Sequence, residues 1–257
     1  MDLKDKVSLI TGGASGIGFA MAGAFAARGA KVVIADVKGV DEAVARLAGA
    51  GAQAAGQPCD VRDEADVARL MDFAVATFGG LDVVVANAGV LRDGLLLRVD
   101  RETKKVAGKL PLSQWKDVID VNLTGVFLTG REAAAKMVDL NTRGVIIALS
   151  SISAKGNFGQ TNYAASKAAV ISLTRVSAIE LGVHGIRVNC ICPGYVLTEM
   201  GAATRTPEMV AKWSAMSPLG RCAEPSEVAD MALFLASDQA RYCTGQAMNV
   251  SGGMVMH

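Results

Sequence analysis

The chain has 257 residues, 51% of them apolar, and its 26 basic side chains nearly balance its 25 acidic ones. This length suits one large domain with a substantial core. The balanced charge gives no electrostatic basis for binding nucleic acid or an anionic membrane surface, and the two histidines are too few for a histidine-based metal site.

Apolar and cysteine patterns indicate a protein that stays in the cytoplasm. The five cysteines show no framework spacing, which predicts reduced and mostly buried thiols. Residues 7–27 carry no charge and are long enough to resemble a membrane span. Five glycines, at positions 12, 13, 16, 18 and 23, interrupt this stretch. We therefore expect a strand, a loop and a buried helix there instead of a membrane span.

Short apolar runs rich in β-branched residues alternate with longer amphipathic stretches. We expect strands at 7–11, 31–36, 54–60, 81–87, 144–150, 186–192 and 246–250. We expect helices at 16–28, 40–49, 63–78, 112–140, 162–183 and 224–236, with Asp63 and Ser113 as N-caps. This alternation predicts an α/β fold: one Rossmann-type, doubly wound parallel sheet of about seven strands with helices on both faces, in a single domain over residues 1–257.

Two regions break the alternation. Residues 90–111 are polar and contain DRETKKVAGK, which predicts a charged loop or a surface hairpin. Residues 194–223 form a long connection with glycines and prolines. Connections of this length in a compact domain are usually functional, so we expect a lid over a substrate.

The stretch TGGASGIG, residues 11–18, follows the first predicted strand and opens a helix. Gly12, Gly16 and Gly18 permit a tight turn and close approach of the backbone to a phosphate. The second strand ends in Asp36, whose carboxylate can bind ribose hydroxyls and would repel a 2′-phosphate. The pattern therefore favours NAD over NADP, with an ordinary surface turn at Asp36 as the alternative.

Two further strand ends fit a dinucleotide. The third strand is followed by Asp60 and Val61, which can hold an adenine edge, and the fourth by Asn87, Ala88 and Gly89, a turn small enough for a cofactor to lie against it. Because the carboxyl ends of parallel strands share one edge of the sheet, these residues are expected to form one binding edge.

Tyr163 and Lys167 are one helical turn apart and can address the same point. A phenol that exchanges protons at neutral pH needs its pKa lowered by ~3 units, or about 4 kcal/mol. One ammonium ~4 Å away at an effective dielectric of ~20 supplies about this much. We therefore expect Tyr163 to act as an acid/base and Lys167 to set its pKa, although exposed pairs of this kind are also common on helices.

Other polar residues could complete such a site. Ser150 or Ser151, at the tip of the fifth strand, could hydrogen-bond a substrate oxygen. Asn122 could hold a water or a backbone carbonyl in a proton path, or could only kink its helix. Serines also end strands for structural reasons alone.

These motifs resemble the short-chain dehydrogenase/reductase family over nearly the whole chain: TGGASGIG, NAG, the strand-end serine, Y-x-x-x-K, VNCICPG and NVSGG. The family places its serine thirteen residues before its tyrosine, which selects Ser150. The resemblance implies a catalytic tetrad of Asn122, Ser150, Tyr163 and Lys167, with Tyr163 and Lys167 also touching the cofactor. It implies further cofactor contacts at Ser15, Ile17, Pro193, Gly194, Val196 and Thr198.

The segment NAGVLRDGLLLR, with LSQWKDVIDVNLTGVF after it, is similar to the 3-oxoacyl-[acyl-carrier-protein] reductase branch. That branch generally uses NADPH, which disagrees with Asp36. The resemblance therefore implies an NAD-dependent secondary-alcohol dehydrogenase or ketone reductase, with a 3-oxoacyl thioester reductase and a polyol or cyclic-alcohol dehydrogenase as alternatives. A dinucleotide-binding regulator without turnover is the non-enzymatic alternative.

The predicted substrate pocket contains residues chosen by position: Leu95, Ser150, Ser151, Ile152, Asn157, Gln160, Tyr195 and Met200. The four cations at positions 101, 104, 105 and 109 could meet an anionic carrier or the phosphates of CoA, although a solvated loop is the simpler interpretation. Helices 112–140 and 162–183 carry more apolar surface than one side of a sheet can cover. We therefore expect a small-molecule enzyme that forms a homotetramer.

Overall fold

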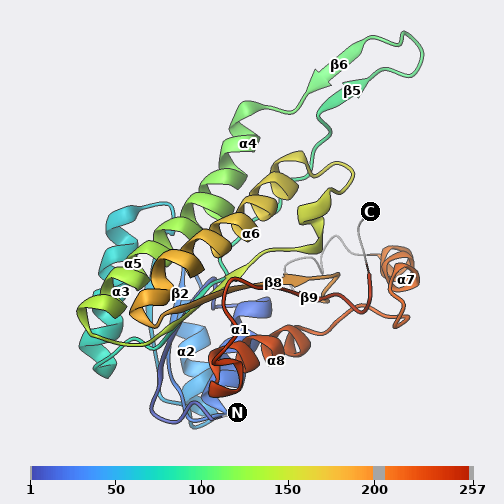
Figure 1. Cartoon of the computed structure of the whole chain (residues 1–257). Helices are drawn as coiled ribbons and strands as arrows, with labels where there is room; N and C mark the ends of the chain where they lie inside the picture. Colours follow the sequence, from blue (N-terminus) through green and yellow to red (C-terminus); the bar gives the residue numbers. More distant parts are fainter. Residues whose placement is uncertain (1, 199–205, 255–257) are drawn as a thin grey trace.

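A parallel sheet with the strand order β3-β2-β1-β4-β7-β8-β9 forms the centre of the computed structural model, which describes residues 2–198 and 206–254 (Figure 1). The chain runs outward from β1 to β3 and then returns to β4 on the other side of β1, so the strand order reverses between β1 and β4. This confirms the doubly wound α/β sheet. The strands are β1 (Val7–Thr11), β2 (Lys31–Asp36), β3 (Ala54–Pro58), β4 (Val83–Ala86), β7 (Val145–Leu149), β8 (Arg187–Pro193) and β9 (Ala247–Val250).

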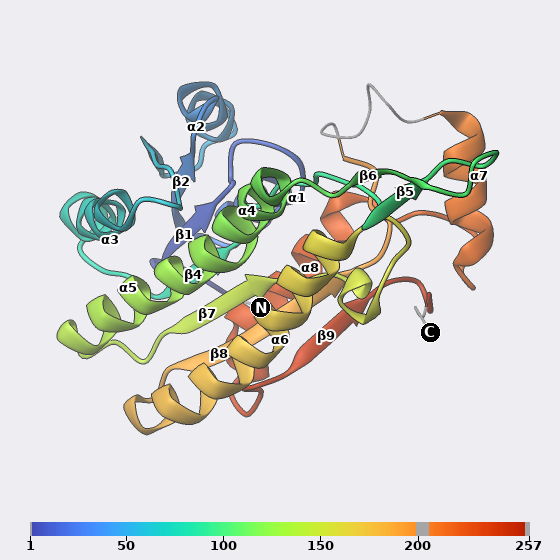
Figure 2. The ribbon, with the colours of Figure 1, turned by 90° about the horizontal axis from the view of Figure 1, so that it is seen from above.

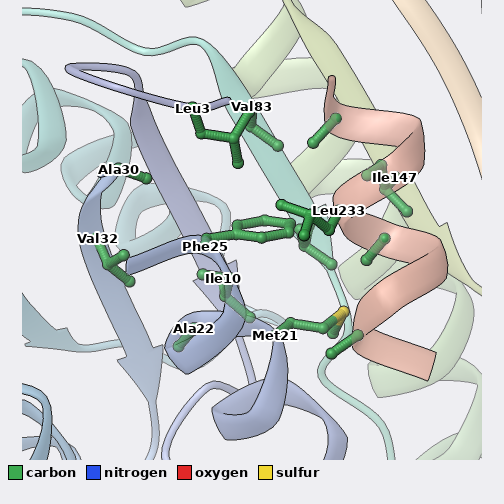
Figure 3. Packing of buried hydrophobic residues seen from close by; sticks show 14 of the residues in the cluster. Leu3, Ile10, Met21, Ala22, Phe25, Ala30, Val32, Val83, Ile147 and Leu233 are labelled. Atoms are coloured by element: carbon green, nitrogen blue, oxygen red, sulfur yellow. The ribbon is translucent and has the colours of Figure 1, made fainter. Parts of the chain in front are cut away.

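Helices cover both faces of the sheet because successive strand residues point to opposite sides. Ile10 packs with Phe25 and Leu233 on one face (Figure 3), whereas Leu9 packs on the other. Each such fully buried side chain contributes about 1.5–3 kcal/mol. The first face is covered by α1 (Gly16–Ala26), α2 (Val40–Gly49) and α8 (Pro225–Ala236), and the second by α3 (Glu64–Phe78), α5 (Gly125–Asp139) and α6 (Thr161–Leu181).

The predicted element boundaries hold to within about two residues, and one of the two predicted N-caps is confirmed. Asp63 caps α3 as predicted, accepting hydrogen bonds from the amides of Ala65 and Asp66. Ser113 is not a cap, because α4 (Leu112–Ile119) begins before it and Pro111 is the N-cap residue. Proline fixes φ near the helical value, so it can precede the first turn.

The helix predicted over residues 112–140 is interrupted. Between α4 and α5 lies a π-helical turn, η1 (Asp120–Thr124), in which the amide of Gly125 donates to the carbonyl of Asp120. Such turns are frequent at functional sites. Figure 2 shows α4 and α5 running beside α6, and Asn122 is fully buried within the π turn.

The region of residues 90–111 forms a hairpin rather than a loop. Strand β5 (Leu97–Val99) pairs with β6 (Val106–Lys109) in antiparallel fashion, and the hairpin projects away from the sheet (Figure 1). We call residues 95–110 the arm. A helix that the sequence did not predict, α7 (Pro207–Met216), lies within the long connection of residues 194–223.

Short 3₁₀ turns complete the structure at η2 (Ile152–Lys155), η3 (Gly182–His184) and η5 (Asp238–Ala240). Among residues 2–198 and 206–254, no helix has the length and apolar character needed to cross a membrane.

Candidate active site

The glycine loop after β1 is shaped by close backbone contacts. Gly12 has φ of +62°, which favours glycine, and a Cβ on Gly18 would lie 2.1 Å from the carbonyl oxygen of Gly12. The side-chain amide of Asn87 donates to the carbonyls of Thr11 (3.0 Å) and Gly12 (2.9 Å). Asn87 therefore holds the loop against the end of β4.

The start of α1 can accept an anion. Ser15 is its N-cap residue but makes no side-chain capping bond, so the first amides of the helix are not capped by it. Gly16 lies beside Thr198, whose Cβ would be 3.6 Å from a Cβ built on the glycine. Ile17 is half-buried against the core. The loop leaves no room for a Cβ at Gly12 or Gly18, and the first amides of α1 are not capped by Ser15. Both features fit the binding of the pyrophosphate of a dinucleotide.

Two carboxylates were predicted at this edge, and they differ in their partners. Asp36 ends β2 beside the loop and accepts only from backbone amides, those of Ala14 at 3.3 Å and Val37 at 2.8 Å. The carboxylate of Asp60 is bound by Arg62, with Nη2 to Oδ2 at 2.6 Å, and this hydrogen bond lowers the pKa of Asp60. Val61, next to it, is buried. Asp36 is thus the more available of the two for a ribose.

The catalytic residues predicted on different elements do come together. Asn122 accepts from the amide of Val90 (2.8 Å) and donates to its carbonyl (2.9 Å). A Cβ on Gly89 would lie 3.4 Å from the Asn122 Oδ1 and 3.7 Å from the Lys167 Nζ. The π turn, the end of β4 and helix α6 therefore meet at one point.

Lys167 is nearly fully buried, and its Nζ donates to the carbonyl of Leu149 at 2.7 Å. Burial lowers the pKa of Lys167 to about 8, and burial also raises the pKa of Tyr163. Lys167 is not among the groups that shift the pKa of Tyr163 in this structure, so a lowering of that pKa by Lys167 stays a prediction. Desolvation disfavours the charged form of both groups, while the ammonium is directed at a carbonyl, 5.6 Å from the centre of the tyrosine ring.

The two strand-end serines have different hydrogen-bond partners. The Ser150 hydroxyl donates to the carbonyl of Lys167 at 2.8 Å, so it is bound to the backbone of α6. The Ser151 hydroxyl is the side chain that hydrogen-bonds Tyr163, an interaction that lowers the pKa of the phenol. The catalytic role of Ser150, chosen by spacing, stays a prediction, and the contact of Ser151 with the phenol makes Ser151 the alternative candidate.

Two of the residues predicted to contact the substrate, Asn157 and Gln160, are hydrogen-bonded to each other. The Asn157 amide donates to the Gln160 Oε1 at 2.9 Å, and the Gln160 Nε2 donates to Asp93. Ile152 is buried in η2, and Leu95 is exposed at the base of the arm. Met200 lies outside the described residues.

The connection after β8 is positioned by one close approach and one stacked pair. A Cβ on Gly194, which follows Pro193, would lie 2.9 Å from the Cα of Ser251, so β9 fixes this turn. Val196 pairs with Ala223 in a bridge. The Tyr195 ring stacks on Trp213 of α7, with centroids 4.7 Å apart and planes within 7°. The stacking connects α7 to the residue predicted to line the substrate pocket.

Neither Asp93 nor Trp213 was predicted as a site residue, although Asp93 lies in the segment NAGVLRDGLLLR. Asp93 lies beside Gln160 where the amide of Gly94 pairs with the carbonyl of Gly159 at 2.8 Å. A pairing between segments so far apart in the chain has no local signal.

Known proteins resemble this chain over nearly its whole length. Residues 12–255 match the family described as enoyl-(acyl carrier protein) reductase. A cis-4-hydroxycyclohexanecarboxylate dehydrogenase from Sinomonas cyclohexanicum is 41% identical over 250 residues, covering 97% of this chain and 96% of the relative. A 3-oxoacyl-[acyl-carrier-protein] reductase from Thermotoga maritima is 39% identical over 260 residues, covering 100% of both chains. The crystal structure of a short-chain type dehydrogenase/reductase from Mycobacterium marinum has a TM-score of 0.88 at 35% identity, covering 100% of this chain and 98% of that one.

Proposed function

The chain belongs to the short-chain dehydrogenase/reductase family, nicotinamide-dependent oxidoreductases that act on alcohols and ketones, and we propose that it interconverts a secondary alcohol and a ketone with NAD(H) as cofactor. The observation that carries this proposal is the convergence of Tyr163, Ser151, Lys167 and Asn122 beside the glycine loop.

Tyr163 is the proposed acid/base. A nicotinamide cofactor held at the glycine loop would supply the hydride that reduces the carbonyl carbon. In reduction the Tyr163 phenol donates its proton to the substrate oxygen, and in oxidation the phenolate takes that proton back. Burial raises the pKa of the phenol, which keeps it protonated at neutral pH, as a proton donor must be.

Three other residues support this step. Ser151, in place of Ser150, donates a hydrogen bond to the same substrate oxygen and polarises the carbonyl. Lys167 would bind the nicotinamide ribose hydroxyls, and Asn122 holds Val90 at the point where a proton path to the bulk would pass. These roles follow those of the family.

NAD is proposed as the cofactor because of Asp36. Its carboxylate follows β2 beside the glycine loop, where it can accept hydrogen bonds from the ribose hydroxyls. A 2′-phosphate at the same place would meet a like charge. The cofactor fits the cradle of Gly12, Gly16 and Gly18, with Ser15, Ile17, Ala88, Pro193, Gly194, Val196 and Thr198 around it.

Two substrate classes remain within the proposal. The similarity to a 3-oxoacyl reductase favours a 3-oxoacyl thioester, and the similarity to a hydroxycyclohexanecarboxylate dehydrogenase favours a cyclic alcohol. Polyols form a further alternative. The stacked pair of Tyr195 and Trp213 offers a flat apolar wall that suits a ring or an acyl chain.

We also propose a homotetramer that works in the cytoplasm. Large apolar side chains on α5, on α6 and just after α6 are exposed to solvent. Ile179 is 78% exposed and Val183 is 85% exposed, and Phe127 and Val176 are also exposed. Pairing of these helices between copies would cover them. Sedimentation at micromolar concentration measures the oligomeric state, and a monomer would contradict the proposal.

The direct test of the function is the initial rate of nicotinamide absorbance change with NADH and NADPH separately. Acetoacetyl-CoA, small diketones, cyclic ketones and ketoses serve as oxidants, and polyols are tested in the reverse direction. We expect a strong preference for NADH. A preference for NADPH would contradict the role of Asp36, and the fastest substrate decides between the thioester and cyclic-alcohol classes.

Tyr163→Phe separates an enzyme from a dinucleotide-binding regulator. We expect turnover to fall by about 10²–10⁴-fold, the usual contribution of a general acid, while NADH still binds. Fluorescence titration with NADH provides the binding control. Unchanged turnover would refute the assigned acid/base.

A further inference from the structure

Asp93 is an acidic residue on the substrate side of the site that has no role in the proposed chemistry. It follows β4 by seven residues and is exposed to solvent. Its carboxylate accepts from the Gln160 Nε2 at 3.1 Å (Oδ1) and 3.3 Å (Oδ2). Because an ionised carboxylate only accepts hydrogen bonds, the contact fixes the orientation of the Gln160 amide.

The negative charge of Asp93 has no neutralising partner. Within residues 2–198 and 206–254, no lysine, arginine or histidine nitrogen lies within 4.0 Å of this carboxylate. The neighbouring Arg92 donates to the carbonyl of Leu91 at 3.0 Å instead. Partial burial raises the pKa of Asp93, and the hydrogen bond from Gln160 opposes this shift because it favours the carboxylate.

The carboxylate is also held in place. The Gln160 side chain is 9% exposed, and its Oε1 accepts from Asn157 at 2.9 Å. The main chain of Asp93 is fixed by Gln114, whose Nε2 donates to the Asp93 carbonyl at 2.9 Å. The next amide, that of Gly94, donates to the carbonyl of Gly159. A charge anchored on both sides cannot swing away from a bound ligand at little cost.

The anchored charge lies close to the reacting atoms. Gln160 is the N-cap residue of α6, three positions before Tyr163. The charge of Asp93 contributes to the raised pKa of Tyr163, so its field reaches the phenol that contacts the substrate oxygen. A second negative charge brought next to this oxygen would be repelled by the same field.

We propose that Asp93 is a specificity-determining residue that selects against substrates with a carboxylate close to the reacting carbonyl group. This inference rests on the proposed function, since it concerns the substrate of Tyr163. It implies that the enzyme prefers neutral esters, thioesters or hydroxylated substrates over oxoacids of the same skeleton.

The test compares acetoacetate with methyl acetoacetate, which share a carbon skeleton and differ in charge. Both compete, in the presence of NADH, against the neutral ketone that wild type reduces fastest, so that inhibition constants are obtained even without their own turnover. In Asp93→Asn we expect the Ki of acetoacetate to fall by about fivefold relative to that of methyl acetoacetate. Asparagine keeps an acceptor for Gln160 and removes the charge.

Glu102→Gln is the matched control, because Glu102 is an exposed acid on the arm, away from Gln160. It should leave the ratio of the two constants unchanged. An equal ratio in wild type and Asp93→Asn, with the neutral ketone still reduced, would overturn this inference and leave the proposed function intact. A wild type that reduces no ketone would instead contradict the proposed function.

A second readout separates charge from structure. The rate of alcohol oxidation rises with pH as Tyr163 loses its proton, and removing the Asp93 charge should move this rise to lower pH. Lys167 on α6 lies 5.6 Å from the centre of the Tyr163 ring, and Cys192 of β8 interacts with Lys167; neither residue is altered. A purely structural role for Asp93 predicts no displacement of the profile.

Discussion

The edge that fits the cofactor and the side that faces the substrate are built in different ways. At the cofactor edge, the backbone itself is the binding surface: a Cβ on Gly18 would collide with Gly12, and Asn87 fastens the loop to β4. On the substrate side, side-chain amides such as those of Gln114 and Gln160 hold otherwise irregular chain. The first construction tolerates almost no added atom, whereas the second can change its polar groups one at a time.

This difference explains how one fold keeps its cofactor while its substrates vary. The arm and α7 lie outside the sheet, and none of the side chains of α7 is buried. Substitutions there leave the core of the sheet untouched. The predictions below test whether the two regions respond as differently as their construction implies.

The largest effect is expected from an added methyl group at the cofactor edge. Gly18→Ala places a Cβ 2.1 Å from the Gly12 carbonyl oxygen, so the loop must move and the Kd for NADH should rise by about 100-fold or more. Gly23→Ala, in the same helix, is the control, since a Cβ there meets nothing within 4 Å and should stabilise the protein by about 0.5–1 kcal/mol. Equal NADH binding in both variants would remove the contrast between the two regions.

The paired serines sharpen the comparison at the point where the regions meet. Ser151→Ala removes the hydrogen bond to Tyr163 and should reduce kcat/KM by about 100-fold. Ser150→Ala removes a buried bond to the Lys167 carbonyl and should lower the free energy of unfolding by about 1 kcal/mol, with a smaller loss of activity. Steady-state kinetics and urea unfolding of both variants provide the measurement. The reverse order of activities would restore Ser150 to the catalytic role.

Lys167 should make the stability of the cofactor-free protein depend on pH. Below about pH 8 both states carry the charge, and the folded state bears the full cost of burying it. Between about pH 8 and pH 10.5 the folded lysine is neutral while the unfolded one still binds a proton, so the free energy of unfolding should rise, by about 3 kcal/mol in total. Lys167→Met should remove this rise in urea melts across the range. A parallel rise in both proteins would show that Lys167 is not its source.

The smallest effect is expected at the arm, where Lys104 and Lys105 form no ion pair within the described part of the chain. If acyl-CoA is a substrate, reversing both charges should lower kcat/KM for acetoacetyl-CoA by about threefold at low ionic strength through weaker steering of the phosphates. Acetoacetyl-N-acetylcysteamine, which lacks these phosphates, is the control substrate and should be unaffected. Equal rates in the variant and wild type for both substrates would identify the arm's charges as solvated only.

The cofactor edge could be predicted from the amino-acid sequence more fully than the substrate side. The sheet, its helices and the glycine loop were predicted because apolar periodicity and glycines record local requirements. The π turn, the choice between Ser150 and Ser151, and the contact of Asp93 with Gln160 were not predicted. Each depends on how a segment is rotated or paired against a distant one, and no single residue type marks that choice. The motif places Lys167 one turn from Tyr163 but does not record how deeply both groups are buried, and burial is the largest cause of both pKa shifts.

The π turn at Asp120–Thr124 fixes the rotational phase between two helices that serve different purposes. Helix α5 packs on the sheet, whereas α4 presents Gln114 to the chain at Asp93. An α-helix turns by about 100° per residue, so removing one residue from the π turn would restore regular winding and rotate α4 by about this angle relative to α5. Gln114 would then face elsewhere, and the carbonyls of Arg92 and Asp93 would lose its hydrogen bonds. The extra residue of the π turn thus sets the orientation of α4, and with it the position of Gln114 on the substrate side, relative to the sheet.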